Sequence, residues 1–310
     1  MHRSRWCRQF SNLIPYFYNA ALSPRGNSCR ALTAAFLPMT YPCNLVTADW
    51  LAQHLNDPSV VVVDCRFALA DPQQGQQQYA AGHIPGACYL DLNQDLSSPV
   101  QAHGGRHPLP VLETFSQRLA AIGVRSTPPT LVVAYDDSRF AFAARLWWLL
   151  RYLGHDNVAV LDGGWSGWVR GDYPTTTEQP APRSGHFTPA PRSEWIVDIE
   201  AVRDRGPETV LIDSRSPERY RGEVEPIDPV AGSIPGAVNY FWQDVSDQNG
   251  QMKASSELAQ HWASLDGANE VIVYCGSGVT ACVNLLAQTL AGRPMARLYP
   301  GGWSDWCSYQ

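Results

Sequence analysis

A single cysteine lies at the junction of two different patterns in the segment VIVYCGSGVTACVNLLAQTL. The residues before Cys275 are β-branched and aromatic, which is typical of a buried strand, and an apolar helical pattern follows it after a glycine-rich turn. Two glycines within this turn let the backbone curl, so that several N–H groups point into one concavity. The N-terminal end of the following helix adds about half a positive charge. The pattern therefore favours the chemistry of a sulfur anion.

The turn also supplies groups that could hold such an anion. Cysteines at helix N-termini have pKa values of roughly 3.5–7.5, below the ordinary value of about 8.5. We therefore expect Cys275 to react as a thiolate and then to carry a persulfide. The residues that we expect to surround its sulfur follow it directly: Gly276, Ser277, Gly278, Val279 and Thr280. The alternative is a small buried residue at a strand end, but a plain core residue would not require Gly-Ser-Gly after it.

The chain repeats itself once, and the repeat indicates which elements position the cysteine. VVVDCR at 61–66 resembles VLIDSR at 210–215, and GHIPGA at 82–87 resembles GSIPGA at 232–237. The Cys275 segment resembles LVVAYDDSRFAFAARLWWLL, in which Asp136 replaces the cysteine, and LDGGWSGW at 161–168 resembles YPGGWSDW at 299–306. Four matches in the same order indicate a duplicated domain.

Short apolar runs alternate with helical patterns in each copy, which predicts an α/β fold with a parallel sheet covered by helices on both faces. Ligands bind such sheets at the carboxyl ends of the strands, where Cys275 lies. We expect an N-terminal extension at 1–43, a non-catalytic domain at 44–170, a Pro-, Thr- and Ser-rich linker at 171–193 and a catalytic domain at 194–310.

Composition and charge limit the binding partners and the cellular compartment that we expect for this chain. The net charge of −6 argues against nucleic acid or an anionic membrane as a partner, and no apolar run approaches the ~20 residues of a membrane span. The eight cysteines form no C-x-x-C, which favours free thiols in the cytoplasm. Residues 1–43 contain five arginines and no acidic residue. We expect a disordered tail there, and the alternative is a mitochondrial presequence. No cluster has metal-ligand spacing, so no metal or organic cofactor is expected.

Together these motifs resemble the tandem-domain sulfurtransferases of the rhodanese superfamily, over about residues 45–306. The loop CGSGVT is similar to that of 3-mercaptopyruvate sulfurtransferases, whereas thiosulfate-specific members usually carry basic residues after the cysteine. The resemblance implies two rhodanese-like domains, of which the first has lost its cysteine. It also implies sulfur transfer from 3-mercaptopyruvate to a thiol or cyanide, with a thioredoxin-like reductant as a further partner. Thiosulfate is the alternative donor.

Two other functions are compatible with this fold. Phosphatases of the same fold need an arginine six positions after the cysteine, to bind the phosphoryl oxygens, and this chain has Ala281 there. A docking module without enzymatic activity would not need an intact cysteine in a full glycine-serine loop. Sulfur transfer therefore remains the preferred interpretation.

The first copy holds an extra segment, SSPVQAHGGRHPLP at 97–110, whose histidines suggest a functional loop. The resemblance implies that His107 in this loop and Asp91 upstream approach Ser277. Such a Ser–His–Asp relay could protonate the enolate that remains after sulfur abstraction. The alternative is a solvated histidine and an ordinary capping aspartate.

Arginines are the candidates for binding the donor. Arg219, in ERYRG, occurs only in the second copy and corresponds in the resemblance to the substrate-binding arginine, whose guanidinium suits a carboxylate. Arg215 has the counterpart Arg66 in the first copy, so we expect it to be structural and paired with Asp213. Mercaptopyruvate enzymes have a second arginine where this chain has Asp228, and in this respect it resembles the thiosulfate branch.

Overall fold

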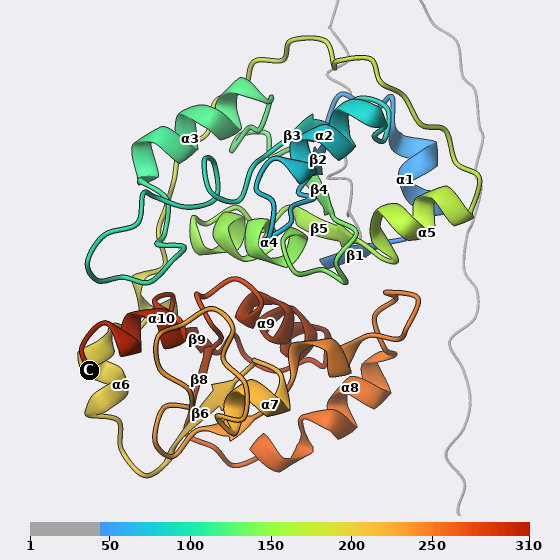
Figure 1. Ribbon diagram of the computed structural model, residues 1–310. Coiled ribbons are helices and arrows are strands. Elements are labelled where there is room, and N and C mark those ends of the chain that lie inside the picture. Colours follow the sequence, from blue (N-terminus) through green and yellow to red (C-terminus); the bar gives the residue numbers. More distant parts are fainter. Residues whose placement is uncertain (1–43) are drawn as a thin grey trace, which may run out of the picture. The chain divides into compact units, whose positions relative to one another are not determined.

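The computed structural model describes residues 44–310, in which the sequence repeat forms two similar α/β halves (Figure 1). The first half contains a five-stranded sheet of order β1-β5-β4-β2-β3, and the second a four-stranded sheet of order β7-β6-β8-β9. Neighbouring strands in both sheets run parallel. The predicted fold class is therefore confirmed. The expectations for residues 1–43 lie outside the described residues.

Strands and helices alternate along both halves. The elements of the first half are β1 (Asn44–Val46), α1 (Ala48–His54), β2 (Val60–Asp64), α2 (Gln74–Ala81), β3 (Cys88–Tyr89), α3 (Leu112–Ala121), β4 (Leu131–Tyr135), α4 (Ala143–Tyr152), β5 (Val158–Leu161) and α5 (Gly164–Arg170). Those of the second half are α6 (Ile199–Arg203), β6 (Thr209–Asp213), α7 (Pro217–Tyr220), β7 (Val238–Asn239), α8 (Ser255–His261), β8 (Glu270–Tyr274), α9 (Ala281–Leu290), β9 (Arg297–Leu298) and α10 (Gly302–Cys307).

Each sheet is buried on both faces, which explains its continuous apolar strands. In β2, Val61 and Val63 belong to the hydrophobic cluster that contains residues of α3 and α4, whereas Val60 and Val62 belong to the cluster of α1 and α5. Successive side chains of a strand point to opposite faces. The second half repeats this layering, with α8 and α9 on one face of its sheet and α6 and α10 on the other. The predicted helices on both faces are therefore confirmed.

The two halves share one hydrophobic core, because α4 packs against α9. In Figure 1 these helices lie between the two sheets. α4 begins shortly after the turn that follows β4 and starts at Asp136. α9 begins shortly after the turn that follows β8 and starts at Cys275. The helix contact therefore places residues of the first half beside the cysteine turn.

The connection between the halves follows the surface of the first half. Residues 171–192, all of which the structure describes, form no helix or strand. The main chain of this segment is bonded to the first half at Thr176, Gly185 and Ala190. The Pro-, Thr- and Ser-rich sequence therefore forms an extended connection held by backbone hydrogen bonds.

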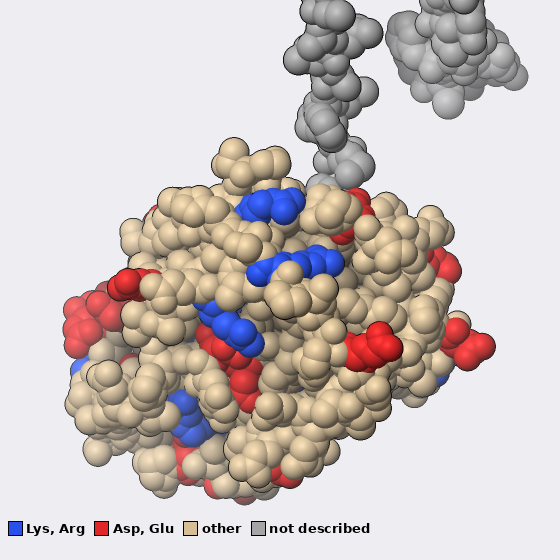
Figure 2. Space-filling model, turned by 90° about the horizontal axis from the view of Figure 1, so that it is seen from above, with Lys and Arg blue, Asp and Glu red and all other residues tan. Residues whose placement is uncertain are grey.

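Charged side chains of both signs are interspersed on the face that Figure 2 displays, and most of that face is uncharged. Within residues 44–310, no helix is both long enough and apolar enough to cross a membrane.

Candidate active site

Cys275 follows the last residue of β8, and only 2% of its surface is exposed. It lines a cavity of about 500 Å³ whose walls come from both halves of the chain. Both halves contribute lining residues. Among those of the second half are Arg215, Arg219, Cys275, Gly276, Ser277, Val279 and Thr280, and among those of the first half are Arg106, His107, Ser138 and Phe142. The structure thus brings most of the expected site residues to one cavity.

The second GGW motif, at 301–303, supports the cysteine turn through main-chain hydrogen bonds. The N–H of Trp303 donates to the carbonyl oxygen of Cys275 (2.8 Å), and the N–H of Ser304 donates to that of Gly276 (2.9 Å). Gly302 has a φ of +61°, and a methyl group there would lie 2.6 Å from the Cys275 carbonyl oxygen. Gly278 has a φ of +71°, and a methyl group there would lie 2.3 Å from the carbonyl oxygen of Pro300. Both glycines are therefore required by the backbone, and they fix the turn against α10.

The first copy of the turn binds an anion from its own chain. The Asp136 carboxylate accepts hydrogen bonds of 2.8–3.1 Å from the main-chain N–H groups of Ser138, Phe140, Phe142 and Ala143. These donors oppose the effect of burial, which raises the pKa of Asp136. The sequence repeat therefore forms a turn that holds a buried carboxylate at the position where the second copy has its cysteine.

His107 reaches the cysteine turn from the extra loop of the first half. Its Nδ1 lies 2.7 Å from the hydroxyl oxygen of Ser277, and each of the two residues is 6% exposed. Burial, together with the positive charges of Arg145 and Arg106, lowers the pKa of His107 to about 3. The imidazole is therefore neutral at physiological pH, with one nitrogen as donor and the other as acceptor.

Asp91 does not join this pair. Its Oδ1 accepts hydrogen bonds from the N–H groups of Asn93 (2.8 Å) and Gln94 (3.0 Å), and its Oδ2 accepts one from the hydroxyl of Tyr89 (3.3 Å). Among residues 44–310, its hydrogen bonds include none to His107. The structure therefore shows no direct hydrogen bond between Asp91 and His107, and the Asp91 carboxylate caps the turn after β3.

The arginine that both copies share is structural, as the sequence predicted. Arg215 forms an ion pair with Asp213 (2.7 Å) and donates to the carbonyl oxygen of Gly232 (2.6 Å). Arg66 makes the same contacts, with Asp64 (2.6 Å) and with the first glycine of the first GxIPGA motif. These ion pairs are buried in both halves, so they connect the two repeated motifs within each half.

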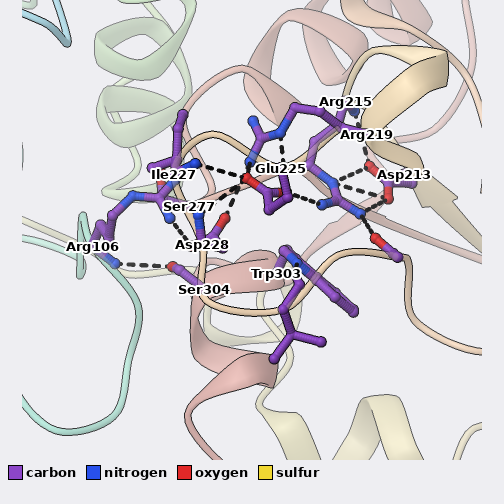
Figure 3. A network of polar contacts seen from close by, with 12 residues as sticks. Arg106, Asp213, Arg215, Arg219, Glu225, Ile227, Asp228, Ser277, Trp303 and Ser304 are labelled. Atoms are coloured by element: carbon purple, nitrogen blue, oxygen red, sulfur yellow. Dashed lines mark hydrogen bonds and ion pairs between the residues drawn. The ribbon is translucent and has the colours of Figure 1, made fainter. Parts of the chain in front are cut away.

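Arg219 lines the cavity and is held by two carboxylates. Its Nη2 lies 2.7 Å from Glu225 and 3.1 Å from Asp228, whose side chains are 3% and 2% exposed. Asp228 also pairs with Arg106 of the first half, as Figure 3 shows. No motif in the sequence marked Arg106 or Glu225 as a site residue. The sequence feature that could have identified Arg106 is its position directly before His107 in the extra loop.

Arg145 is a second residue that the sequence analysis missed. It is completely buried on α4, and its guanidinium donates to the carbonyl oxygens of Gly278 (3.1 Å) and His107 (3.2 Å). None of the ion pairs in the described part of the chain includes it, and burial lowers its pKa. The sequence feature that could have identified Arg145 is that a charged residue stands inside the apolar helix pattern FAARLWWLL.

The other described cysteines are poor nucleophiles at neutral pH. Burial raises the pKa of Cys65, Cys88 and Cys307, and it raises that of Cys282 to about 12. Cys282 lies on α9 and donates its S–H to the carbonyl oxygen of Gly278 (3.4 Å). Residues 44–310 contain no group of three or more His, Cys, Asp or Glu residues that could hold a metal ion.

Comparisons with known proteins identify the family. The model of the rhodanese-like domain matches residues 47–170 and 199–309. A Pseudomonas aeruginosa protein assigned as a 3-mercaptopyruvate sulfurtransferase is 44% identical over 269 residues, which cover 84% of this chain and 94% of the relative. SseB of Mycobacterium tuberculosis, assigned as a thiosulfate sulfurtransferase, is 37% identical over 85% of this chain and 94% of its own length.

Solved structures agree with this result. The crystal structure of SseA from Escherichia coli, described as a 3-mercaptopyruvate sulfurtransferase with the rhodanese fold, matches with a TM-score of 0.70. It is 33% identical, and the match covers 85% of this chain and all of SseA. The chain therefore belongs to the rhodanese family, as a sulfurtransferase with two rhodanese-like domains in tandem.

Proposed function

We propose that this protein transfers a sulfane sulfur from 3-mercaptopyruvate to a thiol or cyanide acceptor through a persulfide on Cys275. The observation that carries the proposal is the cavity that Cys275, residues of the glycine-rich turn after it and Arg219 line together. The identity of 44% to a relative assigned to this reaction supports the choice of donor. In this proposal 194–310 is the catalytic domain, and 44–170 completes its cavity.

In the first step, the Cys275 thiolate attacks the sulfur of 3-mercaptopyruvate. A sulfur–sulfur bond forms while the carbon–sulfur bond breaks, and its electron pair moves onto carbon as the enolate of pyruvate. The proton of the donor thiol is formally delivered to that carbon, so the products are pyruvate and the Cys275 persulfide anion. The N–H groups of the turn from Gly276 to Thr280 hold this anion.

Ser277 and His107 act on the developing enolate. The neutral imidazole of His107 fixes the Ser277 hydroxyl at 2.7 Å, so that the hydroxyl can hydrogen-bond the charge that forms beside it. Asp91 makes no direct hydrogen bond to His107 or Ser277, because its carboxylate is bonded to its own turn. The pair therefore positions a hydrogen bond without a third member.

In the second step, the acceptor attacks the outer sulfur of the persulfide. Cyanide leaves as thiocyanate and a thiolate leaves as its own persulfide, and both reactions regenerate the Cys275 thiolate. A thioredoxin-like dithiol is a third acceptor class, since it would release the sulfur as sulfide and form its own disulfide. No cofactor is needed in any of these steps.

Thiosulfate is the second candidate donor, because Asp228, which pairs with Arg219, stands at the position where mercaptopyruvate enzymes have a second arginine. The ratio of kcat/KM for 3-mercaptopyruvate to that for thiosulfate, measured on the purified protein with cyanide as acceptor, separates the two. We expect 3-mercaptopyruvate to be favoured by at least about tenfold, which corresponds to ~1.4 kcal/mol. A tenfold preference for thiosulfate would contradict this choice of donor.

A further inference from the structure

We propose that the buried guanidinium of Arg145, on α4 of the first half, is the counter-ion of the sulfur anion that Cys275 carries as a thiolate and then as a persulfide. Arg145 acts on this sulfur through the cysteine turn, so it is a positioning residue and not a catalytic one. The inference rests on the proposed function and adds to it a cation from the half that lacks Cys275.

The first argument is that the charge of Arg145 is buried without a carboxylate partner. The side chain is completely buried, and no ion pair within residues 44–310 includes it. Its Nε also has no hydrogen-bond partner in this part of the chain. A buried charge is strongly unfavourable unless an opposite charge lies near it. An anion that forms on Cys275 during the reaction would supply that opposite charge.

The second argument is the peptide group through which Arg145 contacts the cysteine turn. Its Nη1 donates to the carbonyl oxygen of Gly278 (3.1 Å), and the peptide bond from Gly278 to Val279 is trans. In a trans peptide, the carbonyl and the following N–H point in opposite directions. The N–H of Val279 therefore points away from Arg145. Because hydrogen bonds in series strengthen one another, the guanidinium makes this N–H a better donor to an anion.

The third argument is that the N–H groups of the cysteine turn have no partner of their own. Within residues 44–310, none of the main-chain N–H groups from Gly276 to Ala281 has a main-chain or side-chain acceptor. In the first copy of the turn, four N–H groups donate to the carboxylate of Asp136. The second copy has a thiol in place of this carboxylate. Its free donors and Arg145 can therefore act on the same sulfur anion.

The fourth argument concerns the titratable and charged groups around Arg145. Burial lowers the pKa of Arg145, whereas the thiols of Cys282 and Cys275 favour its charged form. Burial raises the pKa of Cys282 to about 12, so this thiol stays protonated at neutral pH. His107, whose pKa is about 3, is neutral, and Arg106 is a second cation. Cys275 lines the cavity, so it is the group among these that can react and supply the negative charge.

The test follows the alkylation of Cys275 by iodoacetamide, an uncharged reagent, as a function of pH in the wild type and in Arg145→Met. Mass spectrometry of the digested protein reports Cys275 separately from the other cysteines. Only the thiolate reacts, so loss of the cation should move the midpoint of the rate–pH curve upward by at least about one pH unit. The rate at the high-pH plateau should not fall, whereas a merely misplaced sulfur would react more slowly at every pH.

Arg151→Met is the matched control. Arg151 lies on the same helix, but its side chain is 20% exposed, pairs with Asp156 (3.4 Å) and does not line the cavity. Its loss should leave the midpoint unchanged. Arg145→Gln keeps a hydrogen-bond donor without the charge, so we expect the same upward shift as in Arg145→Met. This variant also carries the test if the methionine variant does not fold.

Three results would overturn the inference. They are a wild-type midpoint in Arg145→Met or Arg145→Gln, an equal shift in Arg151→Met, and a lower plateau without any shift of the midpoint. Alkylation needs no sulfur donor. If the wild type forms no persulfide from 3-mercaptopyruvate, the proposed function fails, which is a separate result.

Discussion

Asp136 and Cys275 occupy the same place in two copies of one turn. In the first copy, four N–H groups bind the side chain of Asp136, so this turn is already occupied by an anion from its own chain. In the second copy the side chain is a thiol, which can react and then carry a second sulfur as an anion. At the scale of residues, the two turns therefore differ first in the side chain at their opening position, which is a bound carboxylate in one and, in our proposal, the nucleophile in the other.

The buried imidazole of His107 should make stability depend on pH. Its pKa is about 3 in the folded chain and 6.5 as an ordinary histidine. Between these values the unfolded chain binds more protons, so the free energy of unfolding should fall as the pH is lowered from 6.5 towards 3. The slope from one such group is at most ~1.4 kcal/mol per pH unit. Urea unfolding at several pH values measures how the free energy of unfolding depends on pH.

The control for this prediction is His107→Gln. This substitution should reduce the pH dependence of the free energy of unfolding and leave the contribution of His155 in place. Burial also lowers the pKa of His155, which does not line the cavity and bonds the carbonyl oxygen of Thr130. A pH slope that is the same in His107→Gln and in the wild type would contradict the buried neutral imidazole.

Residues that act through the local chain were predictable, and those that depend on distant partners were not. The turn after Cys275 and the Asp213–Arg215 pair follow from a few adjacent positions that recur in both copies. Arg106 and Arg145 act on groups in the other half, at separations of more than 100 residues, which a local pattern does not encode. The hydrogen bonds of Asp91 to its own turn were not predictable either, because a capping carboxylate and a relay carboxylate look alike in sequence.

At the scale of elements, the site depends on how closely α10 approaches the cysteine turn. Two main-chain hydrogen bonds join them, and the glycines of the GGW motif leave room for this contact. Trp303 packs on its other side against Arg215, whose guanidinium carbon lies 4.8 Å from the ring centroid. The motif therefore connects the turn to the ion-pair network.

Gly302→Ala should damage the turn beyond the cost of backbone strain. The new methyl group would lie 2.6 Å from the carbonyl oxygen of Cys275, so the turn must shift. We expect a loss of stability of more than the ~1 kcal/mol that a left-handed alanine costs, and a fall in kcat/KM of at least about tenfold. Thermal unfolding and steady-state kinetics measure the two effects.

Gly292→Ala is the matched control for strain alone. Gly292 also has a positive φ, +78°, but no atom lies within 4 Å of the position of a methyl group. Its variant should lose about 1 kcal/mol and keep normal activity. Equal effects of the two substitutions on activity would argue against the close contact of α10 as the support of the turn.

The sheets were predictable because each central strand is a continuous apolar run between turn residues, and the repeat gave each run a second example. The short strands were harder to define from sequence. β9 has only two residues, Arg297–Leu298, within the segment MARLYP. Such a strand owes its conformation to pairing with β8 more than to its own pattern.

At the scale of the whole molecule, the two halves build one cavity. α4 and α9 share a hydrophobic core, and the first half sends Arg106 and His107 into the site of the second. Arg145 joins the two loops from the interior, because it donates to carbonyl oxygens on both. The half that lacks Cys275 therefore forms part of the cavity wall.

Arg145→Met should separate the role of this residue in the site from its role in the fold. Methionine fills similar space without a buried charge, so we expect the melting temperature to change by only a few degrees. The loops around Gly278 and His107 lose their common donor, so kcat/KM should fall by about tenfold or more. Normal kinetics with a normal melting temperature would contradict this role.

The most direct measurement is the intact mass of the protein after treatment with 3-mercaptopyruvate and removal of the donor. We expect one added sulfur, about 32 Da, which cyanide removes, which Cys282→Ser retains and which Cys275→Ser cannot form. A wild-type protein that gains no mass, or a Cys275→Ser variant that still gains it, would contradict a persulfide on Cys275.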